Sequence, residues 1–180
     1  VRVTPDGGLE LCVGVHSHGQ GMETTLAQVA HQVLGVDVAR IRVVHGDTGT
    51  TPFSTGTYAS RSIVMAGGAV AEACEALVPR LLRIGAALLA CGEQEVRFDS
   101  GRVVGPAGEV SIRDVAQAWF VRPERLPKDV DRGGLEVSVS HRPKIDTGVF
   151  SYASHAVVVA VDPRTGSVEM GGAELARMPA

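Results

Sequence analysis

The sequence predicts an α+β fold, a mixed sheet with packed helices. Apolar residues recur at three- and four-residue spacing over 22–34 and again over 61–88, which indicates two amphipathic helices. Short apolar runs over 9–16 and 41–45 are typical of strands. Strands and helices alternate without the regular rhythm of a βαβ protein, and this irregular order favours an α+β arrangement.

The first third of the chain is expected to form a strand, a helix and a second strand. Gly35 supplies the C-terminal stop of the helix, which begins near Met22. In order, the expected elements are a strand at 9–16, a polar loop at 17–21, a helix at 22–34, a linker at 36–40, a strand at 41–45, a turn at 46–49 and a polar loop at 50–60. Loops as long as the last are often functional.

The second helix carries the longest periodic pattern in the chain and begins near Arg61. Its apolar positions are Ile63, Ala66, Val70, Ala73, Leu77, Leu81, Ile84 and Leu88. Pro79 removes one backbone hydrogen bond, which predicts a kink or two helices meeting near Val78. Gly67 and Gly68 predict close packing against another backbone.

The second half of the chain is expected to contain more strands than helices. Ser111 and Asp114 match a capping box and predict a short helix after a hairpin. In order, we expect a hairpin of 95–98 and 102–104, the short helix, a loop at 121–134, an edge strand at 135–140, a strand at 150–161, a turn at 162–166 and a strand at 167–170. No element is expected after 170.

Composition and charge exclude several classes of function. The net charge is −3 and no Lys/Arg run occurs, which argues against nucleic acid as the main partner. No apolar run approaches the roughly 20 residues of a membrane span, and no signal-peptide pattern is present. Cys12, Cys74 and Cys91 are widely spaced and odd in number. They indicate buried thiols in a reducing compartment, and we therefore expect a cytoplasmic protein.

Two polar loops that each open a helix suggest a binding site. A helix N-terminus leaves backbone N–H groups free and carries a partial positive charge. Glycines before the helices, such as Gly19 and Gly21, allow the backbone to approach an anion closely. Two such ends, near Met22 and Arg61, predict a clamp for a ligand with phosphate groups.

An ordered set of motifs runs through both loops. The motifs are Gly19-Gln20-Gly21-Met22-Glu23-Thr24, His45-Gly46-Asp47-Thr48, Thr51-Pro52-Phe53 and Gly56-Thr57-Tyr58-Ala59-Ser60-Arg61-Ser62. Together they resemble the molybdopterin-binding large subunit of the molybdenum hydroxylases, the xanthine dehydrogenase, aldehyde oxidase and aerobic carbon monoxide dehydrogenase family. The resemblance covers most of the chain and implies a single partial molybdopterin-binding domain over 1–180, with a possible subdivision near 91–110.

The resemblance implies a cofactor, a site and partners. The cofactor is a molybdenum–molybdopterin cytosine dinucleotide. The implied cofactor-binding residues are Gly19, Gln20, Gly21, Tyr58, Ser60, Arg61 and Ser62. The implied partners are the rest of the large subunit and iron–sulfur and flavin subunits. Full-length relatives hydroxylate aldehydes, heterocycles or similar carbon centres with water as the oxygen source.

The sequence also departs from the family pattern. The Gly-x-Gly-Glu loop that carries the catalytic base does not occur, so no catalytic residue is assigned. We expect a fragment of a longer subunit that is inactive by itself. Two alternatives stay open, a non-catalytic remnant that serves subunit assembly and a free-standing nucleotide-binding module.

Several site residues have an ordinary structural alternative. Ser60 and Ser62 are candidates for helix N-caps, and Arg61 for a solvated surface charge. Tyr58 packs either on the pterin or in the core, and the pattern does not decide between them.

Nearby polar residues favour structural roles. Glu23 is expected to complement the dipole of the first helix. His16 and His18 would share one face of a strand, but no third ligand lies at a useful spacing, so we predict no metal site. Asp47 is expected to stabilise the turn after His45 and not to act with it as a general base.

Overall fold

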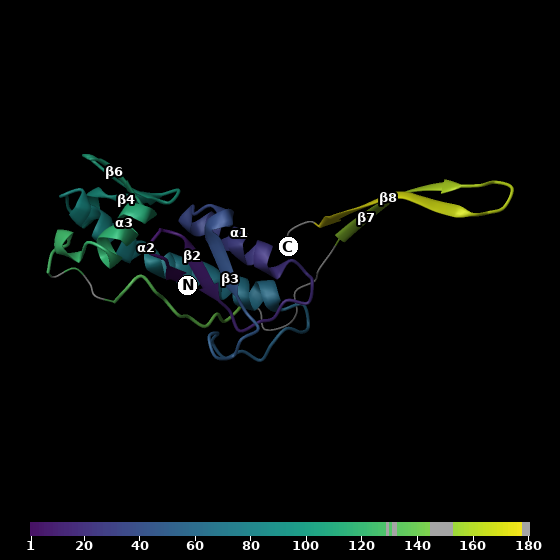
Figure 1. The fold of residues 1–180 in the computed structure, drawn as a ribbon, viewed down its shortest axis with the longest axis horizontal. Helices are drawn as coiled ribbons and strands as arrows, with labels where there is room; N and C mark the ends of the chain where they lie inside the picture. The colour runs from purple at the N-terminus through teal and green to yellow at the C-terminus, as the bar shows by residue number, and fades with distance from the viewer. Residues whose placement is uncertain (129, 131–132, 145–152, 178–180) are drawn as a thin grey trace. The chain divides into compact units, whose positions relative to one another are not determined.

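The computed structural model describes residues 1–128, 130, 133–144 and 153–177. The chain divides into two compact units, Val1–Asp146 and Thr147–Ala180, which are described separately (Figure 1). The first unit contains the predicted mixed sheet and packed helices. None of the helices among the described residues combines the length and apolar character that crossing a membrane requires. The possible subdivision near 91–110 stays a prediction.

A three-stranded sheet forms one side of the first unit. Its strands are β1 (Arg2–Val3), β2 (Leu9–Cys12) and β3 (Ile41–Val44), in that order. β1 and β2 are antiparallel, whereas β2 and β3 are parallel, and Cys12 is the partner of Val44 at the end of the register. β2 is shorter than the predicted strand at 9–16, because the chain leaves the sheet after Cys12.

The segment at 135–140 is extended beside β1, but the prediction of an edge strand there is wrong. The Val3 N–H donates to the Leu135 carbonyl over 2.9 Å, and the Val137 N–H donates to the Val1 carbonyl over 2.9 Å. The hydrogen bonds here amount to a single isolated β-bridge, between Arg2 and Glu136, and not to a continuous strand pairing. The start of the segment still has the alternating exposure of a strand, because Leu135 is buried and Glu136 is exposed.

Helix α1 (Met22–Leu34) has the predicted bounds. Gly35 ends it with a φ of 64°, in the left-handed region that favours glycine. A Cβ at Gly35 would lie 2.3 Å from the Ser100 carbonyl carbon, so the absence of a side chain also allows close packing. A short 3₁₀ helix, η1 (Val38–Arg40), occupies the predicted linker before β3.

The second predicted helix begins with a π-helical turn, η2 (Ile63–Gly67), and continues as α2 (Gly68–Leu88). α2 runs through Pro79 without a break, so the alternative of two helices meeting near Val78 is wrong. Pro79 and Glu75 are both exposed. Pro79 leaves the Glu75 carbonyl without its helical donor, and at an exposed position of a helix water can bond such a carbonyl instead.

The two glycines at the junction of η2 and α2 pack closely, as predicted, but not against a backbone. A Cβ at Gly68 would lie 2.4 Å from His141 Cδ2. His141 Nδ1 in turn lies 2.8 Å from Glu72 Oε1 on α2. The segment at 137–141 thus crosses the start of α2 at close range.

A second, antiparallel sheet lies at the C-terminal ends of both helices. It contains β4 (Arg97–Asp99), β5 (Arg102–Gly105) and β6 (Gly108–Ser111). The hairpin of β4 and β5 was predicted, whereas β6 was not. Helix α3 (Ile112–Phe120) follows with the predicted capping box, and the short 3₁₀ helices η3 (Glu93–Glu95) and η4 (Pro123–Arg125) lie before β4 and after α3.

Helices α1 and α2 run in the same direction (Figure 1). Near their starts, a Cβ at Gly67 would lie 4.0 Å from Leu26 Cδ2. At their ends, Gly35 packs on Ser100 of the β4–β5 turn, and a Cβ at Gly85 would lie 2.6 Å from Val103 of β5. The N-terminal ends of both helices therefore lie at the same end of the unit, away from the second sheet.

The core between the sheets and helices is aliphatic. It contains the inner faces of β1, β2, α1, α2 and α3. Its fully buried side chains include Val3, Leu9, Leu11, Leu26, Leu34, Cys74, Leu77, Leu81, Val103, Val115 and Leu135. This core holds the two long helices in register and so positions the loops that precede them.

The second unit is a two-stranded antiparallel sheet of β7 (Ala153–Val161) and β8 (Val168–Arg177). The predicted turn joins the strands, and the Gly166 N–H donates to the Asp162 carbonyl over 2.8 Å. β8 continues to Arg177, so the prediction of no element after 170 is wrong. Residues 150–152 of the predicted strand lie outside the described residues.

Candidate functional site

Two loops leave the same edge of the first sheet and lead to the two helix N-termini. The first loop, 13–21, connects β2 to α1, and the second loop, 45–62, connects β3 to η2. Because β2 and β3 are parallel neighbours, both loops begin side by side at the carboxyl ends of these strands. The predicted site residues all lie on these two loops.

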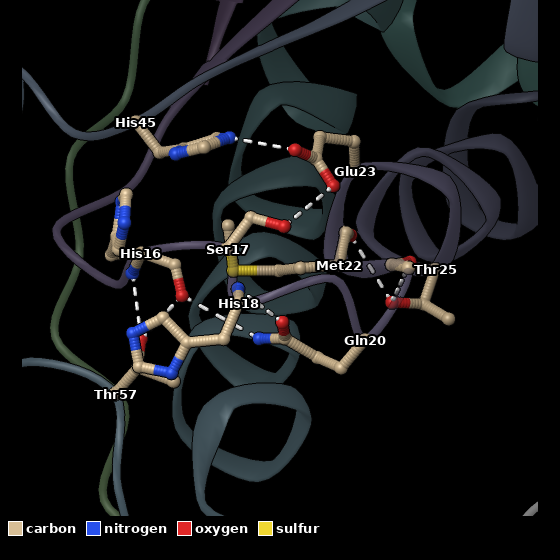
Figure 2. A network of polar contacts seen from close by, with 10 residues as sticks. His16, Ser17, His18, Gln20, Met22, Glu23, Thr25, His45 and Thr57 are labelled. Atoms are coloured by element: carbon tan, nitrogen blue, oxygen red, sulfur yellow. Dashed lines mark hydrogen bonds and ion pairs between the residues drawn. The ribbon is translucent and has the colours of Figure 1, made fainter.

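The hydroxyl of Thr57 joins the two loops (Figure 2). Thr57 Oγ1 accepts a hydrogen bond from the His16 N–H over 2.7 Å. The same hydroxyl donates to the His16 carbonyl, also over 2.7 Å. The helix ends that were predicted to form a clamp are therefore linked through residues 41 positions apart in the sequence.

Gln20 closes the first loop on itself. Its Oε1 accepts from the His18 N–H over 2.5 Å, and its Nε2 donates to the His16 carbonyl over 3.5 Å. Gly19 and Gly21, on either side, have φ values of 90° and 73°. No heavy atom lies within 4 Å of a Cβ built at either glycine, so the backbone beside Gln20 is open to a ligand.

Glu23 ties the start of α1 to both loops. Its carboxylate accepts from Ser17 Oγ over 3.2 Å, and its Oε1 lies 2.8 Å from His45 Nε2 (Figure 2). Its own backbone N–H and the His45 ring hold the pKa of the Glu23 carboxyl below the usual value. The predicted helix-dipole role is thus joined by a positioning role that the sequence did not indicate.

Three imidazole rings lie near one another, and one of them, His45, contacts this carboxylate. The ring centroids of His16 and His18 lie 5.2 Å apart, and those of His16 and His45 lie 5.6 Å apart. His16 and His18 lie on the loop and not on a strand. Among the described residues, no group of three or more His, Cys, Asp or Glu side chains could hold a metal ion. Asp47 accepts from the Gly49 N–H over 2.8 Å, which confirms its role in the turn.

The end of the second loop has an unusual backbone before η2. Ala59 and Ser60 have φ values of 51° and 54°, in the left-handed region that non-glycine residues rarely adopt. Ser62 occupies the cap position but makes no side-chain capping bond, so the N-cap alternative for Ser62 is wrong. Gly21 at the start of α1 has no side chain to cap with. The cap residues of the two tips, Gly21 and Ser62, thus make no side-chain capping bond, although the Glu23 carboxylate bonds its own N–H in the first turn of α1.

Arg61 is half-buried and oriented by its own loop. Its Nη1 donates to Thr55 Oγ1 over 2.8 Å and to the Gly56 carbonyl over 3.0 Å. Its Cζ lies 5.0 Å from the centroid of the Tyr58 ring, within cation–π range. Tyr58 is 55% exposed, which rules out the alternative that it packs in the core.

A groove of about 340 Å³ borders Arg61. It is lined by β2, both loops, the segment at 137–141 and the second helix, including Met65, Ala66 and Ala69. Of the predicted site residues, Arg61 is the one that lines this groove. A cavity of about 700 Å³ beside Arg2, Glu10 and Arg42 borders none of the predicted site residues.

These features fit an elongated anionic ligand. Backbone N–H groups at two adjacent uncapped tips are suited to phosphate oxygens, and the open glycines allow close approach. The sequence missed the positioning role of Thr57, Glu23 and His45. The position of Thr57 inside the 56–62 motif could have indicated its role. The contact between Glu23 and His45 spans 22 residues, and no sequence pattern indicated it.

The chain resembles parts of known molybdenum enzymes. A model of the molybdopterin cofactor-binding domain matches residues 1–174. The chain is 35% identical to the nicotine 6-hydroxylase large subunit of Paenarthrobacter nicotinovorans, over 94% of this chain and 21% of that relative. It is 30% identical to the carbon monoxide dehydrogenase large chain of Afipia carboxidovorans, over 92% of this chain and 20% of that relative.

Solved structures show the same fold. Quinoline 2-oxidoreductase from Pseudomonas putida 86 matches with a TM-score of 0.72 and 28% identity, over 97% of this chain and 22% of that one. The Cu,Mo-CO dehydrogenase matches with a TM-score of 0.70 and 27% identity, over 97% and 22%. The chain spans about a fifth of the length of these relatives. It belongs to the molybdopterin cofactor-binding domain family of the molybdenum hydroxylases.

Proposed function

We propose that this chain supplies two cofactor-binding loops for a molybdenum–molybdopterin cytosine dinucleotide. The first loop contacts the pterin and the second holds the pyrophosphate or nucleotide end. The residues that we assign to the site are Gly19, Gln20, Gly21, Tyr58, Ser60, Arg61 and Ser62. The observation that carries the proposal is the pair of uncapped helix tips at one end of the unit, joined by the Thr57 hydroxyl.

The chemistry of the side chains supports this division. A guanidinium that its loop already orients loses little freedom when it bonds a phosphate, and Arg61 is held by Thr55 and Gly56 in this way. Its Nη1 makes both of these bonds. The Gln20 amide lies beside open glycine backbone and is oriented by its bonds to His16 and His18; an amide carries two N–H donors and an oxygen with two lone pairs, a set that suits the edge of a heterocycle.

The whole protein is proposed to be a molybdenum hydroxylase. When bound, the molybdenum centre supplies the redox chemistry by which such enzymes hydroxylate a carbon centre with oxygen from water. The names of the nicotine and quinoline relatives favour a nitrogen heterocycle among the aldehyde and heterocycle substrates of the family. We assign this chain cofactor binding and no catalytic residue.

Electron acceptors are proposed to lie on partner subunits. An iron–sulfur cluster is held by several thiolates that come together in space. Burial raises the pKa of the Cys74 thiol to about 12, so this residue is poorly suited to bind iron as a thiolate. Iron–sulfur and flavin subunits, together with the rest of the large subunit, are therefore the expected partners.

The direct experiment measures what the isolated complex contains. The chain is produced with its large subunit and neighbouring subunits, molybdenum is measured by mass spectrometry, and acid-released nucleotide by chromatography. We expect molybdenum and CMP in equal amounts. AMP or GMP in place of CMP would contradict the cytosine form, and a soluble complex with neither metal nor nucleotide would point to the assembly remnant.

Replacing Arg61 by Ala tests the second loop. Because a hydrogen bond to a charged group contributes about 1.5–3 kcal/mol, the variant should bind the cofactor about 10- to 100-fold more weakly. Arg97→Ala is a matched control, since Arg97 pairs with Asp99 in the second sheet, at the far end of both helices. An Arg61→Ala complex with full molybdenum and CMP would contradict the role of Arg61.

A further inference from the structure

Beyond the end of the sheet, the hydrogen bonds that link the two loops come from side chains. The last backbone hydrogen bond of the β2–β3 pair beyond the strands runs from the Val13 N–H to the Val44 carbonyl, over 3.0 Å. Among the described residues, no backbone-to-backbone hydrogen bond joins the loops after that point. Beyond that point the Thr57 hydroxyl bonds both the N–H and the carbonyl of His16.

A hydroxyl is well suited to this position. It has one hydrogen to donate and lone pairs that accept, so it can satisfy an N–H and a carbonyl of one residue at the same time. Both bonds are 2.7 Å long. In this way Thr57 imitates a residue of a neighbouring strand and fixes the spacing of the loops beyond the edge of the sheet.

The His16 carbonyl also connects Thr57 to Gln20. This oxygen accepts from Thr57 Oγ1 at 2.7 Å and from Gln20 Nε2 at 3.5 Å (Figure 2). Thr57 precedes Tyr58 directly and lies three residues before Ser60. The Thr57 hydroxyl therefore connects the loop that carries Gln20 to the loop that carries Ser60.

We propose that Thr57 is a positioning residue that sets the separation of the two helix tips, so that its hydroxyl controls how well the cofactor is retained. The inference rests on the proposed function. A ligand that bridges both tips needs them at a fixed distance, and loops reach such precision only when neighbouring bonds support them. Thr57 is not assigned a contact with the cofactor.

The test compares three variants of the complex. Thr57→Val keeps the size and branching of the side chain and removes the hydroxyl, Thr57→Ser keeps the hydroxyl, and Thr51→Val is the matched control. Thr51 Oγ1 donates to the Asp47 carbonyl over 2.8 Å, within its own turn. Removal of groups that support a metal site typically costs 10- to 100-fold in affinity. We expect molybdenum and CMP per complex to fall at least about tenfold in Thr57→Val and to stay near wild type in the other two.

Hydrogen exchange gives a second readout that does not depend on the cofactor. The amide of His16 should exchange faster in Thr57→Val than in wild type or Thr57→Ser, because it loses its acceptor. If Thr57→Val does not fold, Thr57→Ala is measured in its place with the same expectations.

The outcomes separate this inference from the proposed function. A wild-type complex without molybdenum and nucleotide would overturn both. A loaded wild type with an equally loaded Thr57→Val variant would overturn the inference alone. A Thr57→Ser variant as empty as Thr57→Val would also overturn it, since the hydroxyl would then not be the group that matters.

Discussion

Helix α3 and the two long helices begin in opposite ways. At α3 the Ser111 hydroxyl accepts from the Asp114 N–H over 3.2 Å, and Asp114 Oδ2 accepts from the Ser111 N–H over 2.9 Å. These reciprocal bonds close the helix end. At α1 and η2 the cap residues are Gly21 and Ser62, and neither makes a side-chain capping bond.

The difference shows which helix ends are available for a ligand. A helix start leaves donors that need a partner, and a capping box provides partners from within the chain. The chain has a capping box at α3, whereas Gly21 and Ser62, at the ends of the two loops that the Thr57 contact joins, make no side-chain capping bond. We interpret the uncapped tips as the positions at which the cofactor supplies the acceptors.

Glycine substitutions are expected to give the largest contrast. Gly35→Ala at the packed end of α1 should lower the free energy of unfolding by about 2–5 kcal/mol, because it adds left-handed strain and overpacking against Ser100. Gly21→Ala at the open end should cost only about 1–2 kcal/mol, from its φ of 73°. Urea denaturation measures both.

Equal losses in the two glycine variants would contradict the interpretation that the α1 tip is open. The cofactor content of the two complexes adds a second comparison. Gly21→Ala should reduce molybdenum and CMP, since a methyl group would stand where the backbone approaches the ligand. A Gly35→Ala complex that still folds should keep its cofactor.

Serine substitutions compare the capped and uncapped ends directly. Ser111→Ala should lower the free energy of unfolding by about 1 kcal/mol, since it removes a cap. Ser62→Ala should change it by less than about 0.5 kcal/mol, since no capping bond is lost. Thermal unfolding measures both stability changes. The cofactor content should show the opposite pattern, with molybdenum and CMP lost in Ser62→Ala and kept in Ser111→Ala.

Acid unfolding gives the smallest expected effect. The Ser111 hydroxyl, followed by the Ser111 N–H, holds the pKa of the Asp114 carboxyl below its usual value of 3.8. The carboxylate form is thus favoured in the folded state, and its contribution is complete above that value and is lost as pH falls through the lowered pKa. Because Asp114 is exposed, the contribution is less than about 1 kcal/mol.

The measurement is the free energy of unfolding of wild type and Asp114→Asn between pH 5 and pH 2. The wild type should be the more stable protein at pH 5, and the difference should shrink as the carboxyl is protonated. A difference that grows on acidification would show that the charge of Asp114 does not support the α3 cap.

Local chemistry made part of the fold predictable from the sequence. Gly35 ends α1 because a glycine adopts φ of 64° without strain, and the Ser111–Asp114 spacing marks the start of α3. The local rule at Pro79 allowed a kink or a break, and the continuous α2 contradicts only the break. Local rules failed at β6, a four-residue strand whose place is set by pairing with β5.

In the candidate site, too, local features were predictable from the sequence and long-range contacts were not. The open glycines at 19 and 21 follow from short-range patterns that were visible in the sequence. The hydroxyl of Thr57 and the contact between Glu23 and His45 depend on β2 and β3 being parallel neighbours, which no local pattern specifies. The role of Ser62 was undecided for a related reason, since capping and phosphate binding use the same atoms.

The most direct test of the central claim is a titration of the isotope-labelled chain with CDP, followed by the backbone amide signals in NMR spectra. The amide signals at 18–22 and at 60–63 should shift together with one dissociation constant, while those in the first turn of α3 should not move. Shifts at one helix tip alone, or at neither, would contradict the claim that both uncapped tips bind one pyrophosphate-bearing ligand.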